Sequence, residues 1–233
     1  MFLKLVKYLA LKVKGTNFLI DDAISGQELF LLLVDNLLKL LRGFLIFWRF
    51  NKRILVGNGT SIVNRNKIYL KGLNLNIDKD CHIDATSKNG ITIGNGVSIQ
   101  KRTVIECTGS IQKLGLGLVL EDNVGIGSNS FLGCAGGIKI GADTIIGNFV
   151  SFHSENHNYD DLDLPIRLQG VNSRGIIIGS NCWIGAKVTI LDGVDLGDGC
   201  IIAAGAVVKA GTYPPNGIYG GIPAKLIKRR GGD

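Results

Sequence analysis

The sequence has few prolines and histidines, and its cysteines form no recognisable module. It contains four prolines and three histidines against 33 glycines in 233 residues, and no Gly-X-Y triplet array, so collagen is excluded. Five cysteines without a C-x-x-C pair or a zinc-type spacing exclude a sequence-encoded zinc module and indicate a reducing compartment. A hydrophobic content of 45% excludes a disordered chain.

Other absences limit the partners and the location. Aromatic residues make up only 7% of the chain and are not interleaved with basic residues as in nucleic-acid-binding motifs. We therefore expect no nucleic-acid partner, despite a net charge of +7. The first residues lack the small-residue cleavage pattern of a signal peptide, so a cytoplasmic protein is expected.

The C-terminal half contains one cycle of aliphatic and small residues with a period of six. Every sixth residue from Ile178 to Val208 is aliphatic, and a second, smaller position recurs from Cys182 to Ala206. No soluble helix has this period. The pattern predicts short strands, three to a triangular coil of about 18 residues, with coils stacked at a strand spacing of roughly 4.8 Å.

Two finer expectations follow from the same repeat. Gly179, Gly185 and Gly197 come directly after the aliphatic position, where we expect tight corners that need a positive φ. Cys182 and Cys200 lie 18 residues apart, so they should stack in adjacent coils. We interpret them as small buried hydrophobes rather than as a disulfide or a catalytic thiol.

The repeat loses its phase at several points, where the chain should leave the coil. The largest break separates Phe152 from Ile178 and contains "HSENHNYDDLDLPIRLQGVNSRG", a polar stretch with two of the three histidines. Long loops on a rigid scaffold commonly carry function, so residues 153–175 are predicted to form an extruded functional loop. A smaller excursion is expected between Glu106 and Gly117.

Residues 1–53 lack the repeat and contain the apolar run "ELFLLLVDNLLKLLRGFLIFWRF". Asp35, Lys39 and Arg42 interrupt this run too often for a membrane span. Nine basic and four acidic residues give the segment a charge of +5. We predict an amphipathic helical segment that lies in a membrane interface or packs on the β scaffold or in an oligomer. The remaining parts are a β-helix over 54–210 and a C-terminal tail over 211–233.

From about Leu120 to Arg230 the sequence resembles the hexapeptide-repeat acyltransferases, particularly the maltose, galactoside and capsule-sugar O-acetyltransferase branch. The blocks that carry the resemblance are "SFHSENHNYDD", "NCWIGAKVTILDGVDLGDG", "IIAAGAVV" and "GGIPAKLIKRR". The resemblance implies an all-β fold, a left-handed parallel β-helix of hexapeptide repeats with an N-terminal helical segment and a short C-terminal tail. It also implies a homotrimer whose acyl-CoA lies in a groove between neighbouring helices.

The resemblance also implies roles for individual residues. His157 matches the general base that takes the proton of an acceptor hydroxyl, and an imidazole with an ordinary pKa near 6.5 suits that step. His153 stands where the family usually carries a small or polar residue, and we interpret it as loop support or a substrate contact, while Asn129 lies near where relatives bind the acceptor sugar. Ser154 stands where an Asp is frequent, so Glu155, Asp160 and Asp161 are candidates to orient His157, and Glu155 and Asp160 are also candidate substrate contacts.

For acetyl-CoA, the family motif matches two coils and the C-terminal tail. The matched positions are Trp183, Gly185, Ala186, Ala204, Gly205, Lys209, Lys225 and Lys228. Small side chains there would leave the backbone open to the pantetheine amides, and the lysines would meet the nucleotide phosphates.

The sequence thus predicts an acetyl-CoA-dependent O-acetyltransferase of a sugar or polysaccharide-precursor hydroxyl in capsule, exopolysaccharide or lipopolysaccharide synthesis. Its location would be cytoplasmic, or peripheral on the inner face of the membrane if residues 1–53 contact lipid. N-acetyl or serine acyl transfer and a non-catalytic β-helix scaffold remain alternatives. No metal is expected: a γ-type carbonic anhydrase needs three histidines on one metal, and His82 is several coils from His153 and His157.

Overall fold

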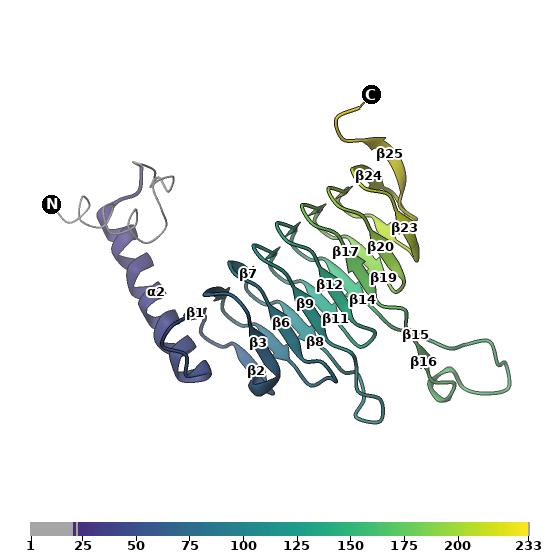
Figure 1. Cartoon of the computed structure of the whole chain (residues 1–233), viewed down its shortest axis with the longest axis horizontal. Helices are drawn as coiled ribbons and strands as arrows, with labels where there is room; N and C mark the ends of the chain where they lie inside the picture. The colour runs from purple at the N-terminus through teal and green to yellow at the C-terminus, as the bar shows by residue number, and fades with distance from the viewer. Residues whose placement is uncertain (1–20, 22, 233) are drawn as a thin grey trace.

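Three long sheets of parallel strands form the faces of one triangular coil (Figure 1). The structure is a computed structural model that describes residue 21 and residues 23–232. Along the chain the strands visit the first, second and third sheet in turn, so each turn adds one strand to every sheet. The first corner lies between the first and second sheets, the second corner between the second and third, and the third corner between the third and first.

The first sheet has nine strands, the second seven and the third seven. The first contains β1 (Arg53–Val56), β4 (Asn74–Ile77), β7 (Val97–Ile99), β10 (Gly125–Ile126), β13 (Ile145–Ile146), β18 (Trp183–Ile184), β21 (Ile201–Ile202), β24 (Gly217–Gly220) and β25 (Lys225–Arg229). The second contains β2 (Ser61–Val63), β5 (His82–Asp84), β8 (Val104–Glu106), β11 (Phe131–Gly133), β14 (Ser151–His153), β19 (Thr189–Leu191) and β22 (Val207–Val208). The third contains β3 (Ile68–Leu70), β6 (Ile91–Ile93), β9 (Leu118–Leu120), β12 (Ile138–Ile140), β17 (Ile176–Ile178), β20 (Val194–Leu196) and β23 (Gly211–Tyr213).

The six-residue repeat fills the interior of the coil, as the sequence predicts. The six aliphatic positions of the repeat are at most 1% exposed: Ile178, Ile184, Ile190, Leu196, Ile202 and Val208. They stack in register between coils, with Ile184 beside Ile202 and Ile190 beside Val208. A column of aliphatic side chains therefore runs through the molecule, and its burial is the main source of stability of such an array.

The structural reason for glycine directly after the aliphatic position differs from the sequence prediction. Gly179, Gly185 and Gly197 do not adopt a positive φ. A Cβ on Gly185 would instead lie 2.6 Å from the backbone nitrogen of Ala204 in the next coil. These glycines are needed for the close approach of coils. The left-handed conformation falls two residues further on, at Asn181, Lys187, Gly193, Gly199 and Gly205.

The cysteines behave as buried core residues. All five are free thiols with buried side chains. Cys182 and Cys200 lie in adjacent coils, because the residues that follow them, Trp183 and Ile201, are register partners. Burial raises the pKa of the Cys182 thiol to about 11. A thiol with such a pKa stays protonated at neutral pH, which agrees with a packing role.

One long helix, α2 (Gly26–Phe47), precedes the coil. Its N-terminus is fixed by a capping box, in which Ser25 and Glu28 exchange side-chain and backbone hydrogen bonds. Its C-terminus ends at Trp48, which adopts a left-handed conformation. Among the described helices, none combines the length and apolar character that crossing a bilayer requires.

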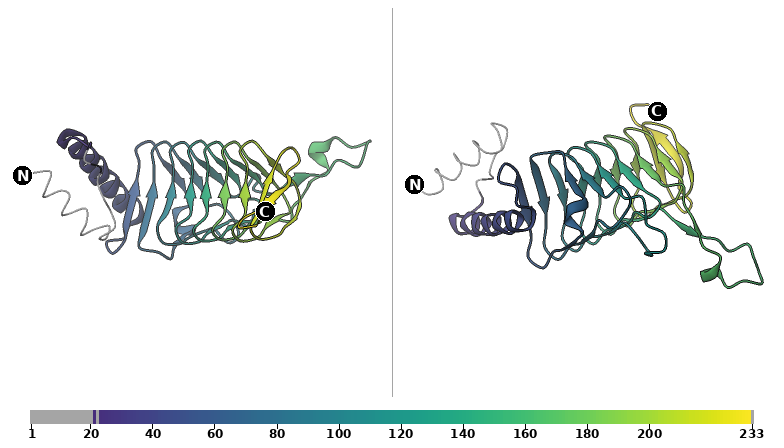
Figure 2. Two further views of the ribbon diagram at one scale, coloured as in Figure 1. Left: turned by 90° about the horizontal axis from the view of Figure 1, so that it is seen from above. Right: turned by 60° about the horizontal axis from the view of Figure 1, so that its bottom comes forward.

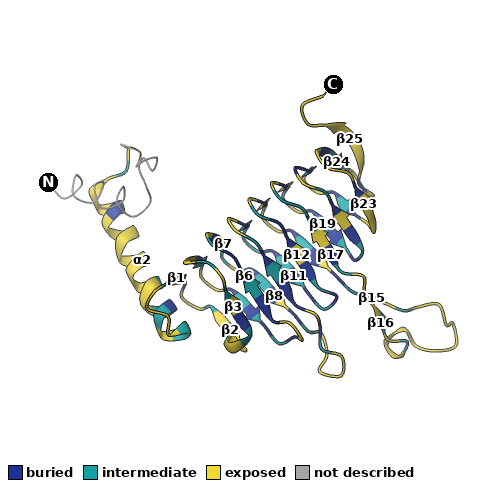
Figure 3. Ribbon diagram, viewed as in Figure 1, coloured by how far each residue is buried: buried dark blue, intermediate teal, exposed yellow. Residues whose placement is uncertain are grey.

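Helix α2 directs its charged stripe toward the coil and leaves much of its apolar surface exposed (Figure 3). Lys39 pairs with Asp35 of the helix and with Asp78 of the coil, at 2.9 and 3.0 Å. At Gly43 the helix approaches so closely that a Cβ would lie 2.0 Å from the Ile54 carbonyl oxygen. Its last turn packs apolar residues against the core of the coil, through Ile46 and Phe47. The described part of this segment thus packs on the β scaffold through one side and its C-terminal end.

Two excursions leave the second corner, both at phase breaks of the repeat. The smaller runs between β8 and β9 and contains an isolated bridge between Ser110 and Lys113. The larger lies between β14 and β17 and includes β15 (Asn156–His157), β16 (Val171–Asn172) and a short 3-10 turn, η2 (Ile166–Leu168). Figure 2 shows this loop projecting from the coil near its C-terminal end, while α2 lies at the opposite end. A second 3-10 turn, η1 (Arg65–Lys67), precedes β3.

Candidate active site

His157 lies near the foot of the large loop, which projects from the second corner. It belongs to β15, which pairs antiparallel with β16 and places His157 opposite Val171. The two-stranded pairing holds the backbone on either side of the imidazole, and the residue is exposed. An exposed imidazole on a supported loop can reach a bound substrate, which agrees with the predicted role of His157 without testing it.

A buried carboxylate fastens the two ends of this loop to the coil. Asp192, only 3% exposed, lies in the turn after β19. Its carboxylate accepts the backbone N–H groups of Arg174 at 2.9 Å and Gly175 at 2.8 Å, where the loop returns to the coil. It also accepts the side-chain amide of Asn156, at 3.4 Å, where the loop departs. Asp192 therefore acts on both feet of the loop.

Asn158 braces the loop directly after His157. Its side-chain nitrogen donates to the Gln169 carbonyl oxygen at 3.0 Å, and its side-chain oxygen accepts the amide of Asn172 at 2.6 Å. The side chain of Gln169 in turn bonds the backbone of Asp161 from both directions, accepting its N–H at 3.1 Å and donating to its carbonyl at 2.7 Å. The loop is thus an ordered hydrogen-bonded unit.

The residues predicted to orient His157 do not bind its imidazole among the described residues, and Ser154 has another role. Ser154 is buried and structural: its hydroxyl donates to the Gly133 carbonyl oxygen at 2.7 Å and accepts the Gly136 N–H at 2.9 Å. The Asp161 carboxylate accepts the N–H of Asp163 at 2.9 Å. Over the described residues, no hydrogen bond joins the His157 imidazole to Glu155, Asp160 or Asp161.

The other histidines do not join His157 in one cluster. His153 is exposed on the outer face of the second sheet, with its ring centre 5.6 Å from that of Phe131. His82 lies in β5, three strands away from β14 in the same sheet. In residue 21 and residues 23–232, no group of three or more His, Cys, Asp or Glu side chains is arranged to hold a metal ion.

Asn129 lies at the first corner, on the opposite side of the second sheet from the loop. It adopts a left-handed φ of 57°, and its side-chain oxygen accepts the Nε–H of Arg102 at 2.8 Å. This geometry is typical of an asparagine that forms a corner. The structure of one chain therefore does not bring Asn129 and His157 together.

Four of the eight predicted coenzyme positions lie together at the first corner. Gly185 and Ala186 lie directly beneath Ala204 and Gly205 of the next coil, and the Gly185 N–H donates to the Ile202 carbonyl oxygen at 2.8 Å. Ala204 and Gly205 are exposed, and a Cβ on Gly205 would meet nothing within 4 Å. The backbone at this corner is therefore open to a ligand.

Trp183, Lys225 and Lys228 lie on the first sheet, whereas Lys209 lies at the second corner. Trp183 is 53% exposed on the outer face of the first sheet, between Ile145 and Ile201. Lys225 and Lys228 are exposed in β25, opposite Gly220 and Ile218, and Lys209 is exposed after β22. The C-terminal end of the coil is thus basic beside an open backbone.

The sequence gives little indication that Asp192 and Asn158 hold the loop in place. In "LDGV" an Asp before a glycine reads as an ordinary corner residue. The usable signal is the coil register, because Phe152 and Ile190 are partners and Asp192 therefore lies beside Ser154, where the loop departs. Asn158 carries no such signal, since its partners come from within the irregular loop.

Comparison with known proteins agrees with this architecture. Residues 175–210 match the family model described as bacterial transferase hexapeptide (six repeats). Among solved structures, a mutant of AntD, an N-acyltransferase from Bacillus cereus in complex with dTDP and coenzyme A, superposes with a TM-score of 0.54 at 18% identity. That match covers 77% of this chain and 82% of AntD, and it establishes the fold.

Two curated relatives share more of the sequence. Rv3034c of Mycobacterium tuberculosis, named as an acetyltransferase, is 30% identical over 171 residues, which are 72% of this chain and 52% of that protein. WbbJ of Escherichia coli strain K12, named as an O-acetyl transferase of lipopolysaccharide biosynthesis, is 29% identical over 127 residues, which are 51% of this chain and 64% of WbbJ. The chain thus spans between half and two thirds of the length of these relatives. Its repeats, coil and relatives together show that the chain resembles the hexapeptide-repeat transferases and has their fold, a left-handed parallel β-helix.

Proposed function

We propose that the protein is an acetyl-CoA-dependent O-acetyltransferase that acts on a sugar hydroxyl in the synthesis of a capsule, exopolysaccharide or lipopolysaccharide. The observation that carries the proposal is the tethered loop, which presents an exposed histidine beside a hexapeptide coil with an open glycine and alanine corner. The names of the relatives Rv3034c and WbbJ support the same reaction and acceptor class.

In the proposed reaction His157 is the general base. It removes the proton of the acceptor hydroxyl while that oxygen attacks the thioester carbonyl carbon of acetyl-CoA. The C–S bond breaks, the new ester C–O bond forms, and the imidazolium returns its proton to the leaving thiolate. Proton transfer of this kind contributes about 10²- to 10⁴-fold to the rate.

The coenzyme would lie along the first corner. There Gly185, Ala186, Ala204 and Gly205 offer backbone groups to the pantetheine amides, with Trp183 at the border. Lys209, Lys225 and Lys228 would meet the phosphates of the nucleotide end, because a compact ammonium group suits a phosphate oxygen.

The active form would be a homotrimer. The His157 loop leaves the second corner of a chain, whereas the coenzyme residues and Asn129 lie at the first corner. A neighbouring copy would bring its first corner against this loop and so assemble the site between two chains. Of the other predicted contacts, His153, Glu155 and Asp160 lie on the loop side of such a site.

Residues 1–53 would contact the inner face of the membrane. Residues 1–20 and 22 lie outside the described part of the chain, so the support comes from α2. Its exposed apolar side chains are Leu31, Leu32, Leu33, Val34, Leu37, Leu38, Leu40, Leu41 and Leu45. Burial of this surface in an interface would favour a peripheral location, close to lipid-linked acceptors.

An acceptor screen with labelled acetyl-CoA tests the proposal. Transfer to a sugar should yield an ester that alkaline hydroxylamine cleaves. A label that resists hydroxylamine would indicate an amide and would replace O-transfer by N-transfer. Absence of acetyl-CoA binding would leave the non-catalytic scaffold as the better interpretation, and the homotrimer is tested independently by light scattering.

A further inference from the structure

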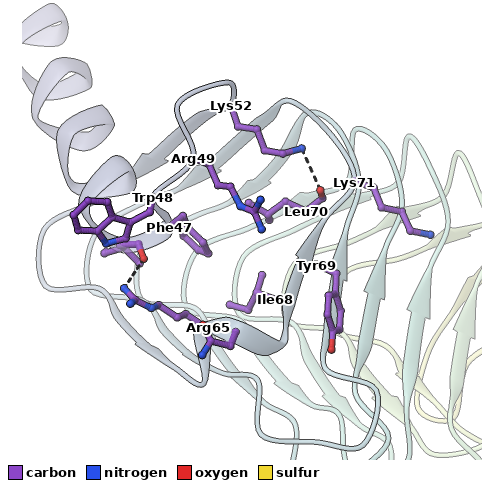
Figure 4. Close-up of a pocket in the computed structure, with 11 residues that line it drawn as sticks. Phe47, Trp48, Arg49, Lys52, Arg65, Ile68, Tyr69, Leu70 and Lys71 are labelled. Carbon is purple, nitrogen blue, oxygen red and sulfur yellow. Dashed lines mark hydrogen bonds between the residues drawn. The ribbon is translucent and has the colours of Figure 1, made fainter.

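A cationic pocket lies at the end of the molecule opposite the proposed active site. It has a volume of about 530 Å³ and lies between the end of α2 and the first coil. Figure 4 shows its side chains, with Arg49 and Lys52 coming from the segment after α2, and Arg65 and Lys71 from the first coil. Among the residues that the structure describes, the lining contains these four cations and no acidic residue.

Two of the four cations have structural partners. Lys52 donates to the carbonyl oxygens of Leu70 at 3.2 Å and Gly72 at 2.7 Å. Arg65 donates to the carbonyl oxygen of Ile46 at 2.7 Å, which satisfies the end of α2. Carbonyl groups carry no net charge, so both cations keep a full positive charge beside the pocket.

The other two cations, Arg49 and Lys71, hold no backbone carbonyl group among the described residues. Both are exposed, and the ion pairs among the described residues involve other lysines, namely Lys39 and Lys139. Four like charges around one cavity repel each other, and an anion bound among them would relieve that repulsion. Arginine and lysine around a cavity are the groups that bind phosphate.

The rim of the pocket is aromatic and continues into the apolar surface of α2. Trp48 lines the pocket and is 64% exposed, and Phe50 is 85% exposed. Both rings lie against Phe44 of the helix, with ring centres 5.8 Å and 4.4 Å apart. Exposed tryptophan beside basic residues is typical of segments at the level of lipid headgroups.

We propose that this pocket binds the phosphate headgroup of an anionic phospholipid in the bilayer. Arg49 would contact the phosphate oxygens, Lys71, Arg65 and Lys52 would add positive potential, and Trp48 and Phe50 would lie beside the glycerol and upper acyl chain. The proposal rests on the membrane contact proposed for residues 1–53 and specifies its lipid. A free phosphate would use the cations but not the adjoining apolar surface, so charge and surface together favour the lipid.

Co-sedimentation of the full-length protein with vesicles tests this assignment. The vesicles contain either phosphatidylcholine alone or phosphatidylcholine mixed with phosphatidylglycerol. The test variant is Arg49→Gln/Lys71→Gln, because these side chains hold no backbone group. The control is Lys88→Gln/Lys101→Gln, which removes the same charge from the coil outside the pocket. Circular dichroism checks that both variants fold.

We expect the parent protein to prefer the anionic vesicles, the test variant to lose about 10- to 30-fold in binding to them, and the control to lose about 2-fold at most. Equal losses in both variants would show general attraction and overturn the pocket assignment. Equal binding of the parent protein to both vesicle types would also overturn it while leaving an apolar membrane contact intact. Absence of binding to either would remove the membrane contact as well.

A soluble anion is tested separately by thermal shift with inorganic phosphate and with a nucleoside diphosphate. If either stabilises the parent protein but not Arg49→Gln/Lys71→Gln, while vesicle binding is unchanged, the pocket binds a soluble phosphate and the lipid assignment is wrong. Acetyl-CoA affinity should be equal in all forms. The outcome for the lipid is therefore distinguishable from failure of the proposed acetyltransferase activity.

Discussion

The carboxylate of Asp192 accepts the backbone N–H of Arg174 at 2.9 Å, and this bond fixes the point at which the loop that carries His157 returns to the coil. The two residues are 18 positions apart, one full turn of the coil, so the bond joins adjacent coils. Because the same carboxylate binds Gly175 and Asn156, one buried side chain sets the position of the whole loop.

Replacing Asp192 should loosen the loop. Asp192→Ala would leave the N–H groups of Arg174 and Gly175 without their acceptor, at a cost of about 1–3 kcal/mol in unfolding free energy. Transfer should fall about 10- to 100-fold because His157 is displaced, with acetyl-CoA affinity nearly unchanged. Asp192→Asn keeps one acceptor oxygen, so its losses of stability and transfer should lie between those of the parent protein and of Asp192→Ala. Asp195→Ala, on an exposed side chain of β20, serves as the control, and equal behaviour of the two Ala variants would contradict the tether.

Removing the His157 imidazole should affect chemistry alone. His157→Ala should lower the transfer rate about 10²-fold or more, since a general base is lost from an exposed position that supports no packing. Acetyl-CoA affinity and thermal unfolding should stay close to the parent values. His153→Ala is the matched comparison, and if that variant loses transfer while His157→Ala keeps it, the assignment of the base is wrong.

Filling the first corner should block the coenzyme. Ala204 is exposed above Gly185, so Ala204→Trp would occupy the surface assigned to pantetheine without disturbing the core. Isothermal titration should then detect at least a 10-fold loss of acetyl-CoA affinity, because burial of the coenzyme chain is prevented. The control is Asp195→Trp on the outer face of the third sheet, which should bind acetyl-CoA with the affinity of the parent protein. Unchanged affinity in Ala204→Trp would place the coenzyme elsewhere.

A methyl group at Gly43 should displace α2 from the coil. An added Cβ would overlap the Ile54 carbonyl oxygen, and overpacking of this kind costs about 1–3 kcal/mol. Gly43→Ala should therefore lower the unfolding temperature and expose α2 to limited proteolysis. Gly109→Ala adds the same methyl group where nothing lies within 4 Å and should change neither measurement.

The buried thiols should make the protein less stable in alkali. The pKa of Cys182 is about 11 when folded, against 9.0 for an ordinary thiol. The unfolded chain therefore loses its proton first, and the free energy of unfolding should decrease as pH rises from about 9 to 11. Cys182→Ala should show a shallower decrease in denaturant titrations, and alanine fits because Ala206 fills the same position of the repeat. An identical decrease in both proteins would contradict the burial effect.

The interior of the coil could be predicted from the sequence because its period is imposed by geometry. Ile184 and Ile202 are buried partners simply because one turn takes 18 residues. The two phase breaks likewise mark where the chain leaves the second corner. The prediction for Gly185 was wrong in its cause, since a sequence shows that glycine is needed but does not distinguish a positive φ from a close approach of two backbones.

The contacts between segments distant in sequence could not be predicted. Asp192 looks like any corner residue until the coil register brings it beside the loop. Helix α2 turns Lys39 toward Asp78 because Gly43 permits close approach on that side, whereas a hydrophobic pattern alone would direct the leucines inward. His157 could be proposed only from the family resemblance, since exposure and position alone do not distinguish a base from a solvated loop residue.

The closure of both ends of the coil has a consequence for self-association. A stack of parallel strands would present unpaired backbone at its first and last turns, and such edges template endless polymerisation. Here α2 lies on β1 at Ile54, Lys52 binds carbonyl groups at the end of β3, and the antiparallel strand β25 covers β24 at the other end. Helix α2, Lys52 and β25 therefore cover strand edges of a structure that could otherwise grow into a fibre, and they limit the addition of further strands there.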